Sequence, residues 1–81
     1  MDHSLTILRN IWKNTLEIEN IEDNDHFFIL GGDSFLASII VLTIADTMEL
    51  DITLLDLYEN PTLIEFSNRL EQRRNIKNLT I

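Results

Sequence analysis

The absence of cysteine from a chain of only 81 residues restricts its fold more than any other feature of the sequence. Without cysteine there are no disulfides, no thiol catalysis and no thiolate metal sites. Domains commonly have about 100 to 150 residues, so a chain this short forms one core. Hydrophobic residues make up 44% of the chain, which is enough to build that core. We therefore predict a single domain over residues 1–81, held together by packing alone.

Apolar residues recur at three- and four-residue spacing along much of the chain, which is the pattern of amphipathic helices. Two capping boxes, Thr53 with Asp56 and Thr62 with Glu65, indicate two further helix starts, and Pro61 separates them. No segment shows the pattern of a strand, so the predicted fold class is all-α, a compact four-helix bundle. The predicted helices cover about residues 4–16, 34–48, 53–59 and 62–74, the third is short, and residues 75–81 are a frayed tail.

A long loop, residues 17–33, separates the first two predicted helices. Its first half is polar, and its second half is apolar and ends at Gly31-Gly32, which break the chain. Loops of this length are uncommon in compact domains and tend to be functional, provided that they are pinned to the core. The predicted pins are four apolar side chains: Ile21, Phe27, Phe28 and Leu30.

Charge is distributed unevenly along the chain, whose formal net charge is −8. No Lys or Arg lies between Lys13 and Arg69, whereas twelve Asp or Glu do. Such a field repels phosphate backbones, so we expect no nucleic acid and no membrane as a partner, and favour a basic or apolar protein. The chain lacks a signal peptide and any run of roughly 18 apolar residues, so we predict a soluble, cytoplasmic protein.

A serine, Ser34, stands where the glycine pair meets the start of the second predicted helix. The first-turn amides and the positive end of the helix dipole stabilise a phosphate at such a position. The glycines would let the backbone of another protein approach the serine closely. On local sequence alone, a plain helix cap formed by Ser34 or Asp33 is the more common explanation.

The wider sequence pattern favours a functional role for Ser34 over a plain helix cap. Residues 27–34, with the sequence Phe-Phe-Ile-Leu-Gly-Gly-Asp-Ser, are followed by an apolar helix and resemble the core motif of peptidyl carrier domains of nonribosomal peptide synthetases. Residues 11–12, 25–28 and 56–62 also resemble recurrent stretches of that family. The Gly-Gly-Asp-Ser form is more typical of peptidyl and aryl carriers than of fatty-acid or polyketide acyl carriers.

The resemblance implies a bundle of the acyl carrier protein-like type that carries 4′-phosphopantetheine, transferred from coenzyme A to Ser34 by a phosphopantetheinyl transferase. Gly32 and Asp33 would lie beside that group. Such a protein is not an enzyme, because it holds an aminoacyl, peptidyl or acyl intermediate as a thioester and presents it to adenylation, condensation or thioesterase type enzymes. We expect a monomer, and Met1 and the short tails favour a free-standing protein.

The second predicted helix is apolar on two faces, when residues are placed about 100° apart around its axis. The face predicted to meet the core consists of Leu36, Ile40, Ile44 and Thr47. The opposite face consists of Phe35, Ile39 and Leu42, with Asp33, Asp46 and Glu49 at its rim. We interpret this second face as an exposed docking stripe for partner enzymes, with core packing as the alternative. The family often has a polar residue at the position of Ile39.

Other functions fit the sequence less well. Residues 32–36 lack the closing glycine of a hydrolase nucleophile elbow, and His3 and His26 are the only candidate general bases. A calcium loop beginning at Asp23 fails because Phe27 occupies a ligand position. The glycine pair lacks the Lys of a nucleotide-binding loop. A polyketide or fatty-acid type acyl carrier, and a helical interaction domain without a prosthetic group, remain as alternatives.

Overall fold

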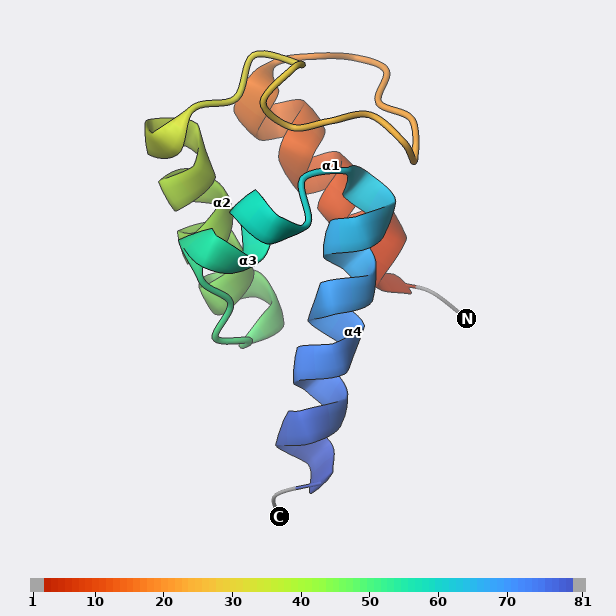
Figure 1. The fold of residues 1–81 in the computed structure, drawn as a ribbon, viewed down its shortest axis with the longest axis vertical. Helices are drawn as coiled ribbons and strands as arrows, with labels where there is room; N and C mark the ends of the chain where they lie inside the picture. Colours follow the sequence, from red (N-terminus) through yellow and green to blue (C-terminus); the bar gives the residue numbers. More distant parts are fainter. Residues whose placement is uncertain (1–2, 80–81) are drawn as a thin grey trace.

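A computed structural model of the chain describes residues 3–79, and the side chains of residues 4–75. It contains four helices: α1 (His3–Leu16), α2 (Ser34–Met48), α3 (Leu54–Glu59) and α4 (Leu63–Leu79) (Figure 1). Within this part of the chain there is no strand, and an isolated antiparallel bridge joins His26 to Thr62. None of the described helices is both long and apolar enough to cross a membrane. The all-α prediction is confirmed.

Both predicted capping boxes are present. The Thr53 hydroxyl accepts a hydrogen bond from the Asp56 N–H at 3.2 Å, and the Asp56 carboxylate accepts one from the Thr53 N–H at 2.9 Å. Thr62 and Glu65 exchange the same pair of bonds at the start of α4, each at 3.3 Å. These reciprocal bonds satisfy backbone donors that a helix start leaves without partners, and they fix where α3 and α4 begin.

The predicted end of the last helix is wrong. We expected it to stop at Arg74, but α4 continues to Leu79. The sequence after Arg74 lacks any Gly or Pro, so no residue ends the hydrogen-bonding pattern there. Residues 80–81 of the predicted tail, and Met1 and Asp2 at the other end, lie outside the described residues.

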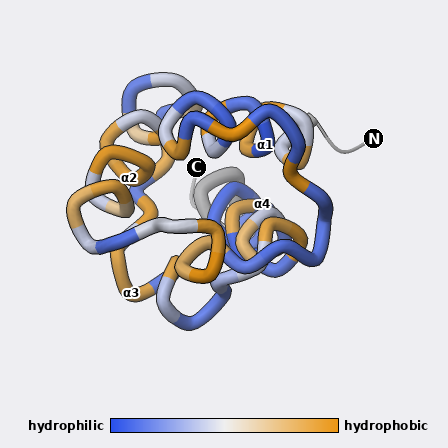
Figure 2. The backbone as a smooth tube through the Cα atoms, turned by 90° about the horizontal axis from the view of Figure 1, so that it is seen from above, coloured by the Kyte–Doolittle hydropathy of each residue, from blue (hydrophilic) through white to orange (hydrophobic). Residues whose placement is uncertain are grey.

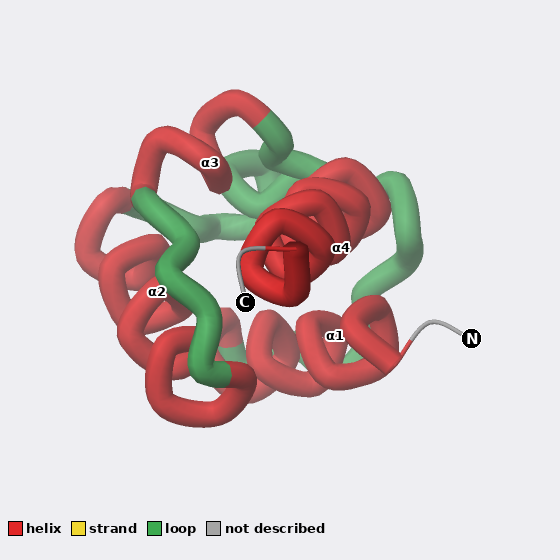
Figure 3. Tube along the Cα trace, turned by 90° about the horizontal axis from the view of Figure 1, so that it is seen from below, coloured by secondary structure: helices red, strands yellow, loops and turns green. Residues whose placement is uncertain are grey.

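The helices enclose one core. In Figures 1 and 3, α1 and α4 lie next to each other, α2 flanks α1, and the short α3 lies between α2 and α4. Figure 2 shows that α2 and α3 are the more hydrophobic helices along the backbone. Each fully buried large apolar side chain stabilises the fold by about 1.5–3 kcal/mol. The largest of them are Trp12, Phe27, Phe66, Leu8, Ile40, Ile44, Leu57, Leu63 and Leu70.

The core face of α2 follows the prediction except at its end and at Ala37, which is fully buried although it was not predicted to be. Ile40 and Ile44 are fully buried, and Leu36 packs partly against the core. Thr47 was predicted to lie in the core but is exposed. In this last turn of α2 the neighbouring Met48 makes the contact with the core, so Thr47 is left in solvent although it lies on the same side of the helix.

The long loop between α1 and α2 is attached to the rest of the domain in both of its halves. The sequence predicted anchors mainly in its second half, yet Arg9 of α1 also donates a hydrogen bond to the carbonyl oxygen of Ile21 and pairs with Asp23. Further on, the Phe27 N–H donates to the carbonyl oxygen of Pro61 at 2.8 Å, which ties the loop to the start of α4. All four predicted pins contact the core: Ile21, Phe27, Phe28 and Leu30.

Candidate functional site

Ser34 is the first residue of α2, and its side chain is exposed. The preceding residue, Asp33, is the N-cap, and its carboxylate accepts a hydrogen bond from the Leu36 N–H at 2.9 Å. The structure therefore decides between the two possible caps, and the Ser34 hydroxyl is not needed to cap the helix. It lies instead 2.7 Å from the hydroxyl oxygen of Tyr58 in α3.

The start of α2 suits an anion attached to Ser34. The N–H groups of a first helical turn have no partners within the helix. Asp33 takes the N–H of Leu36, which leaves those of Ser34 and Phe35 facing the same end of the helix. These donors and the helix dipole favour a phosphodiester. The carboxylate of Asp33 would repel the same charge, so its contribution lies in ordering the first turn.

Glycine is needed at positions 31 and 32, before Ser34, for different structural reasons. Gly31 has φ 112°, in a region that other residues rarely adopt. At Gly32, an added Cβ would lie 2.3 Å from a ring carbon of Phe27, a fully buried side chain. The interpretation that both glycines leave room for an approaching protein was therefore incomplete, because Gly32 is required by packing inside the domain.

Tyr58 is a residue of the site to which the sequence assigned no role. Its ring stacks on that of Phe28, with centroids 5.1 Å apart and planes at 2°. Phe28 meets Phe27 edge to face at 5.0 Å, and Phe27 meets Trp12 in the same way at 5.2 Å. A continuous row of aromatic rings thus connects the surface beside Ser34 with the centre of the core.

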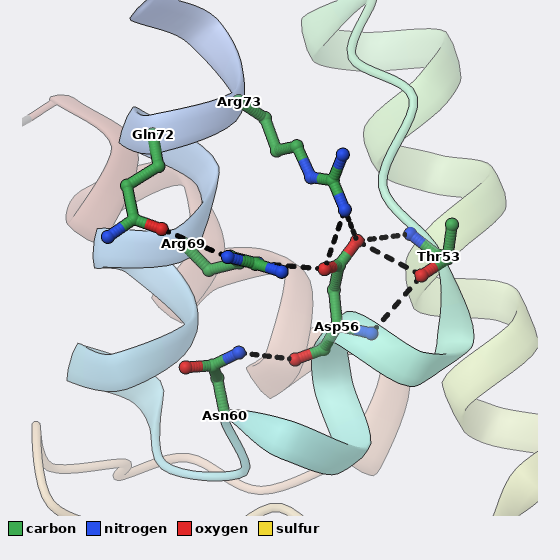
Figure 4. A network of polar contacts seen from close by, with 6 residues as sticks. All are labelled: Thr53, Asp56, Asn60, Arg69, Gln72 and Arg73. Atoms are coloured by element: carbon green, nitrogen blue, oxygen red, sulfur yellow. Dashed lines mark hydrogen bonds and ion pairs between the residues drawn. The ribbon is translucent and has the colours of Figure 1, made fainter. Parts of the chain in front are cut away.

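Asp56, predicted only as a capping residue, also joins α3 to α4 (Figure 4). Its carboxylate is 2% exposed and accepts hydrogen bonds from Arg69 at 2.8 Å and Arg73 at 3.0 Å, besides the backbone of Thr53. Burial by itself would raise the pKa of Asp56, but the hydrogen bonds from Arg69, Thr53 and Arg73 outweigh it and lower the pKa to about 2. Asp56 is therefore an ionised anchor for the helix that carries Tyr58.

The predicted docking stripe is only partly exposed. Phe35 is 72% and Leu42 69% exposed, whereas Ile39 is half-buried. Ile39 lies about 100° around α2 from the buried Ile40, at the border between the core and solvent. Other large apolar side chains are exposed on the loop and on α3: Ile29, Leu54, Leu55 and Tyr58.

The surface around the stripe is acidic. Asp33, Asp46 and Glu49 are all exposed, as predicted for its rim. All six Lys and Arg of the chain belong to α1 or α4, so α2, α3 and the loops contain none. Any partner that approaches Ser34 therefore meets negative charge and apolar side chains together.

Residues 6–70 match the family described as phosphopantetheine attachment site. The chain belongs to this family. The match covers the loop, the start of α2 with Ser34, and α3 with Tyr58. The resemblance inferred from residues 27–34 is thereby confirmed, and 4′-phosphopantetheine is the prosthetic group of the family. The match favours a carrier over a helical interaction domain without a prosthetic group.

Relatives of the carrier domain occur in large synthetases. The chain is 41% identical over 64 residues to malpinin synthetase of Mortierella alpina, covering 79% of the chain and 1% of that protein. It is 45% identical over 56 residues to a phenolphthiocerol/phthiocerol polyketide synthase of Mycobacterium tuberculosis, covering 69% of the chain and 4% of that protein. The chain thus spans a very small part of these relatives.

A solved structure shares the fold of this carrier domain over nearly its whole length. It is the solution structure of an extended docking domain complex of the Pax nonribosomal peptide synthetase, containing PaxA T1-CDD and PaxB NDD. The two chains are 25% identical and superpose with a TM-score of 0.86, over 95% of this chain and 74% of the other. The prediction of an acyl carrier protein-like bundle is therefore confirmed.

Proposed function

We propose that Ser34 carries the 4′-phosphopantetheine group, and that the protein holds an aminoacyl, peptidyl or acyl intermediate as a thioester for a nonribosomal peptide or related pathway. The observation that carries this proposal is the exposed Ser34 hydroxyl, which stands at the first turn of α2 and is not used as a cap. The protein contributes an attachment point and a docking surface, while the partner enzymes supply the catalysis. A cytoplasmic location fits the lack of cysteine and is part of the proposal.

The roles of this chain's own residues follow from the site. In attachment, the Ser34 oxygen forms a bond to the phosphorus that carries the pantetheine part of coenzyme A, and the bond from that phosphorus to the bridging oxygen of the diphosphate breaks. Adenosine 3′,5′-bisphosphate leaves, and the serine proton passes to a base of the transferase. The free N–H groups at the start of α2 stabilise the resulting negative charge. When bound, the group supplies a flexible arm with a terminal thiol. Asp33 and Gly32 hold the first turn and the loop in place.

Incubation with coenzyme A and a broad-specificity phosphopantetheinyl transferase tests the proposal. We expect the intact mass to rise by one phosphopantetheine group, and peptide mapping to place it on Ser34. The Ser34→Ala variant, which loses only the hydroxyl, should show no gain. Ser38→Ala is the matched control, because it removes a hydroxyl one turn further along α2 and should load normally. A wild-type chain that stays unmodified would refute the proposal.

Phe35, Ile39 and Leu42 belong to the same proposal as the contact surface for partner enzymes, namely a phosphopantetheinyl transferase and adenylation, condensation or thioesterase type enzymes. Phe35 and Leu42 offer most of the apolar area, and Ile39 contributes its exposed edge. A carrier must visit several enzymes in turn, so its contacts are small and exchange rapidly. A few exposed side chains on a monomer, within an acidic field, suit such contacts.

A polyketide type acyl carrier is the second candidate, supported by the identity to the mycobacterial polyketide synthase. The two candidates differ in cargo. Transfer of an aminoacyl group to the loaded protein by an adenylation enzyme supports the first, and transfer of a malonyl group by an acyltransferase supports the second. The Gly-Gly-Asp-Ser sequence of residues 31–34 favours the first.

A further inference from the structure

The contact between Ser34 and Tyr58 joins two helices at the proposed attachment point. The two hydroxyl oxygens are 2.7 Å apart, which is the usual distance for a hydrogen bond between hydroxyl groups. The residues are 24 positions apart in the chain, so the contact depends on how α3 lies against α2. Tyr58 is the only tyrosine in the sequence.

Tyr58 is held firmly although its side chain is 45% exposed. One face of its ring stacks on Phe28, which is itself packed against Phe27. The two preceding residues are buried: Leu57 lies in the core, and Asp56 is bonded to α4 through two arginines (Figure 4). The Tyr58 hydroxyl therefore keeps a defined position relative to α2, as does the Ser34 oxygen that it contacts.

The hydrogen-bonding roles of the pair change when a phosphate is attached to Ser34. In the free protein either hydroxyl can donate. Once the Ser34 oxygen is bonded to phosphorus it has no proton, so Tyr58 is the donor that remains in the pair. Its acceptor is then an oxygen of a negatively charged phosphodiester, and hydrogen bonds to charged acceptors are stronger than neutral ones.

We propose that Tyr58 is a positioning residue for Ser34: its hydroxyl orients the serine oxygen before attachment and donates a hydrogen bond to the phosphodiester afterwards. This inference rests on the proposed function, because it requires that Ser34 is the attachment residue. It assigns α3 a direct part in the site, in addition to its exposed apolar side chains.

The first test compares transferase kinetics of the wild type with Tyr58→Phe, which removes the hydroxyl and keeps the ring that stacks on Phe28. One hydrogen bond is worth about 0.5–1.5 kcal/mol, so we expect kcat with respect to the carrier to fall about two- to tenfold. KM should stay unchanged, because Phe35 and Leu42 are intact. The control is Ser38→Ala, which removes a hydroxyl that donates to the backbone carbonyl oxygen of Ser34 at 3.0 Å rather than to its side chain.

The second test is spectroscopic and also works on the wild type alone. With tyrosine labelled at the ring carbon that bears the hydroxyl, the single resonance of Tyr58 should move on loading. The phosphorus resonance of the loaded protein should differ between the wild type and Tyr58→Phe, and not between the wild type and Ser38→Ala. If Tyr58 acted only through packing, the phosphorus resonance would be the same in the wild type and in Tyr58→Phe, because the variant keeps the ring that stacks on Phe28.

The results of these experiments distinguish the proposed attachment at Ser34 from the proposed role of Tyr58. A wild-type chain that is not loaded overturns the proposed function itself. A wild-type chain that loads on Ser34 with the same kcat as Tyr58→Phe overturns the orienting role. A tyrosine resonance that is identical before and after loading overturns the contact with the phosphodiester, and this result stands even if the variant fails to fold.

Discussion

Replacement of Asp56 by Asn should lower the free energy of unfolding of the domain by about 2 kcal/mol at neutral pH. Asp56→Asn removes the negative charge that Arg69 and Arg73 contact, and it keeps one oxygen for the capping box. The pKa of Asp56 is lowered from 3.8 to about 2, which corresponds to a stabilisation of about 2 kcal/mol at neutral pH. Removing one partner of a fully buried ion pair costs about 3–5 kcal/mol, but here both arginines are about one third exposed, so the smaller value applies.

A loss of about 2 kcal/mol is large for this chain, because 81 residues correspond to a total stability of about 4–12 kcal/mol. Urea unfolding followed by the fluorescence of Trp12, the single and fully buried tryptophan, measures it directly. The matched control is Asp46→Asn, which removes the same charge from an exposed position in α2 and should change the free energy of unfolding by less than about 0.5 kcal/mol.

The pH dependence distinguishes the anchor from a general effect of the substitution. A carboxyl group whose pKa is lower in the folded state stabilises fully above its unfolded pKa, and this stabilisation is lost as the pH falls through the folded pKa. The difference in free energy of unfolding between wild type and Asp56→Asn should therefore have its full value at pH 7 and about half of that value at pH 3. A difference that stays constant over this range, or one no larger than that of Asp46→Asn, would refute the reasoning.

Two further substitutions test the surroundings of Ser34. Gly32→Ala should lower the free energy of unfolding by about 1–3 kcal/mol in the same urea assay, because its Cβ would lie 2.3 Å from the ring of the buried Phe27; an unchanged midpoint would contradict the close contact. Leu42→Glu should leave the melting temperature within a few degrees, because the side chain is 69% exposed, while turnover by partner enzymes falls. Unfolding of that variant, or unchanged turnover, would argue against a docking role.

Much of the fold followed from local rules. The bounds of α2 were predicted as residues 34–48 and are Ser34–Met48, because a glycine pair before the helix and an unbroken apolar segment within it are both visible in the sequence. The capping boxes of α3 and α4 were likewise visible as pairs three residues apart. The end of α4 was not, since propensities that permit a helix do not state where it stops.

Of the proposed site, Ser34 could be predicted from the sequence but its surroundings could not. A motif marks the serine, whereas the contact with Tyr58 depends on the placement of α3 against α2, which no local pattern records. Asp56 belongs to the capping box of α3 and also pairs with arginines of α4. Only the capping role could be predicted from the sequence. The half-buried position of Ile39 depended on which neighbours cover the flank of α2, a property of packing that periodicity does not supply.

The separation of charge described for this domain gives the molecule an electric dipole. Every basic residue lies on α1 or α4, whereas α2 and α3 carry acidic residues without any basic ones. The field of a basic partner exerts a torque on such a dipole in addition to attracting it. A basic partner would therefore turn the domain so that the side with Ser34 faces it, and a larger share of collisions would begin in the orientation that the proposed function requires.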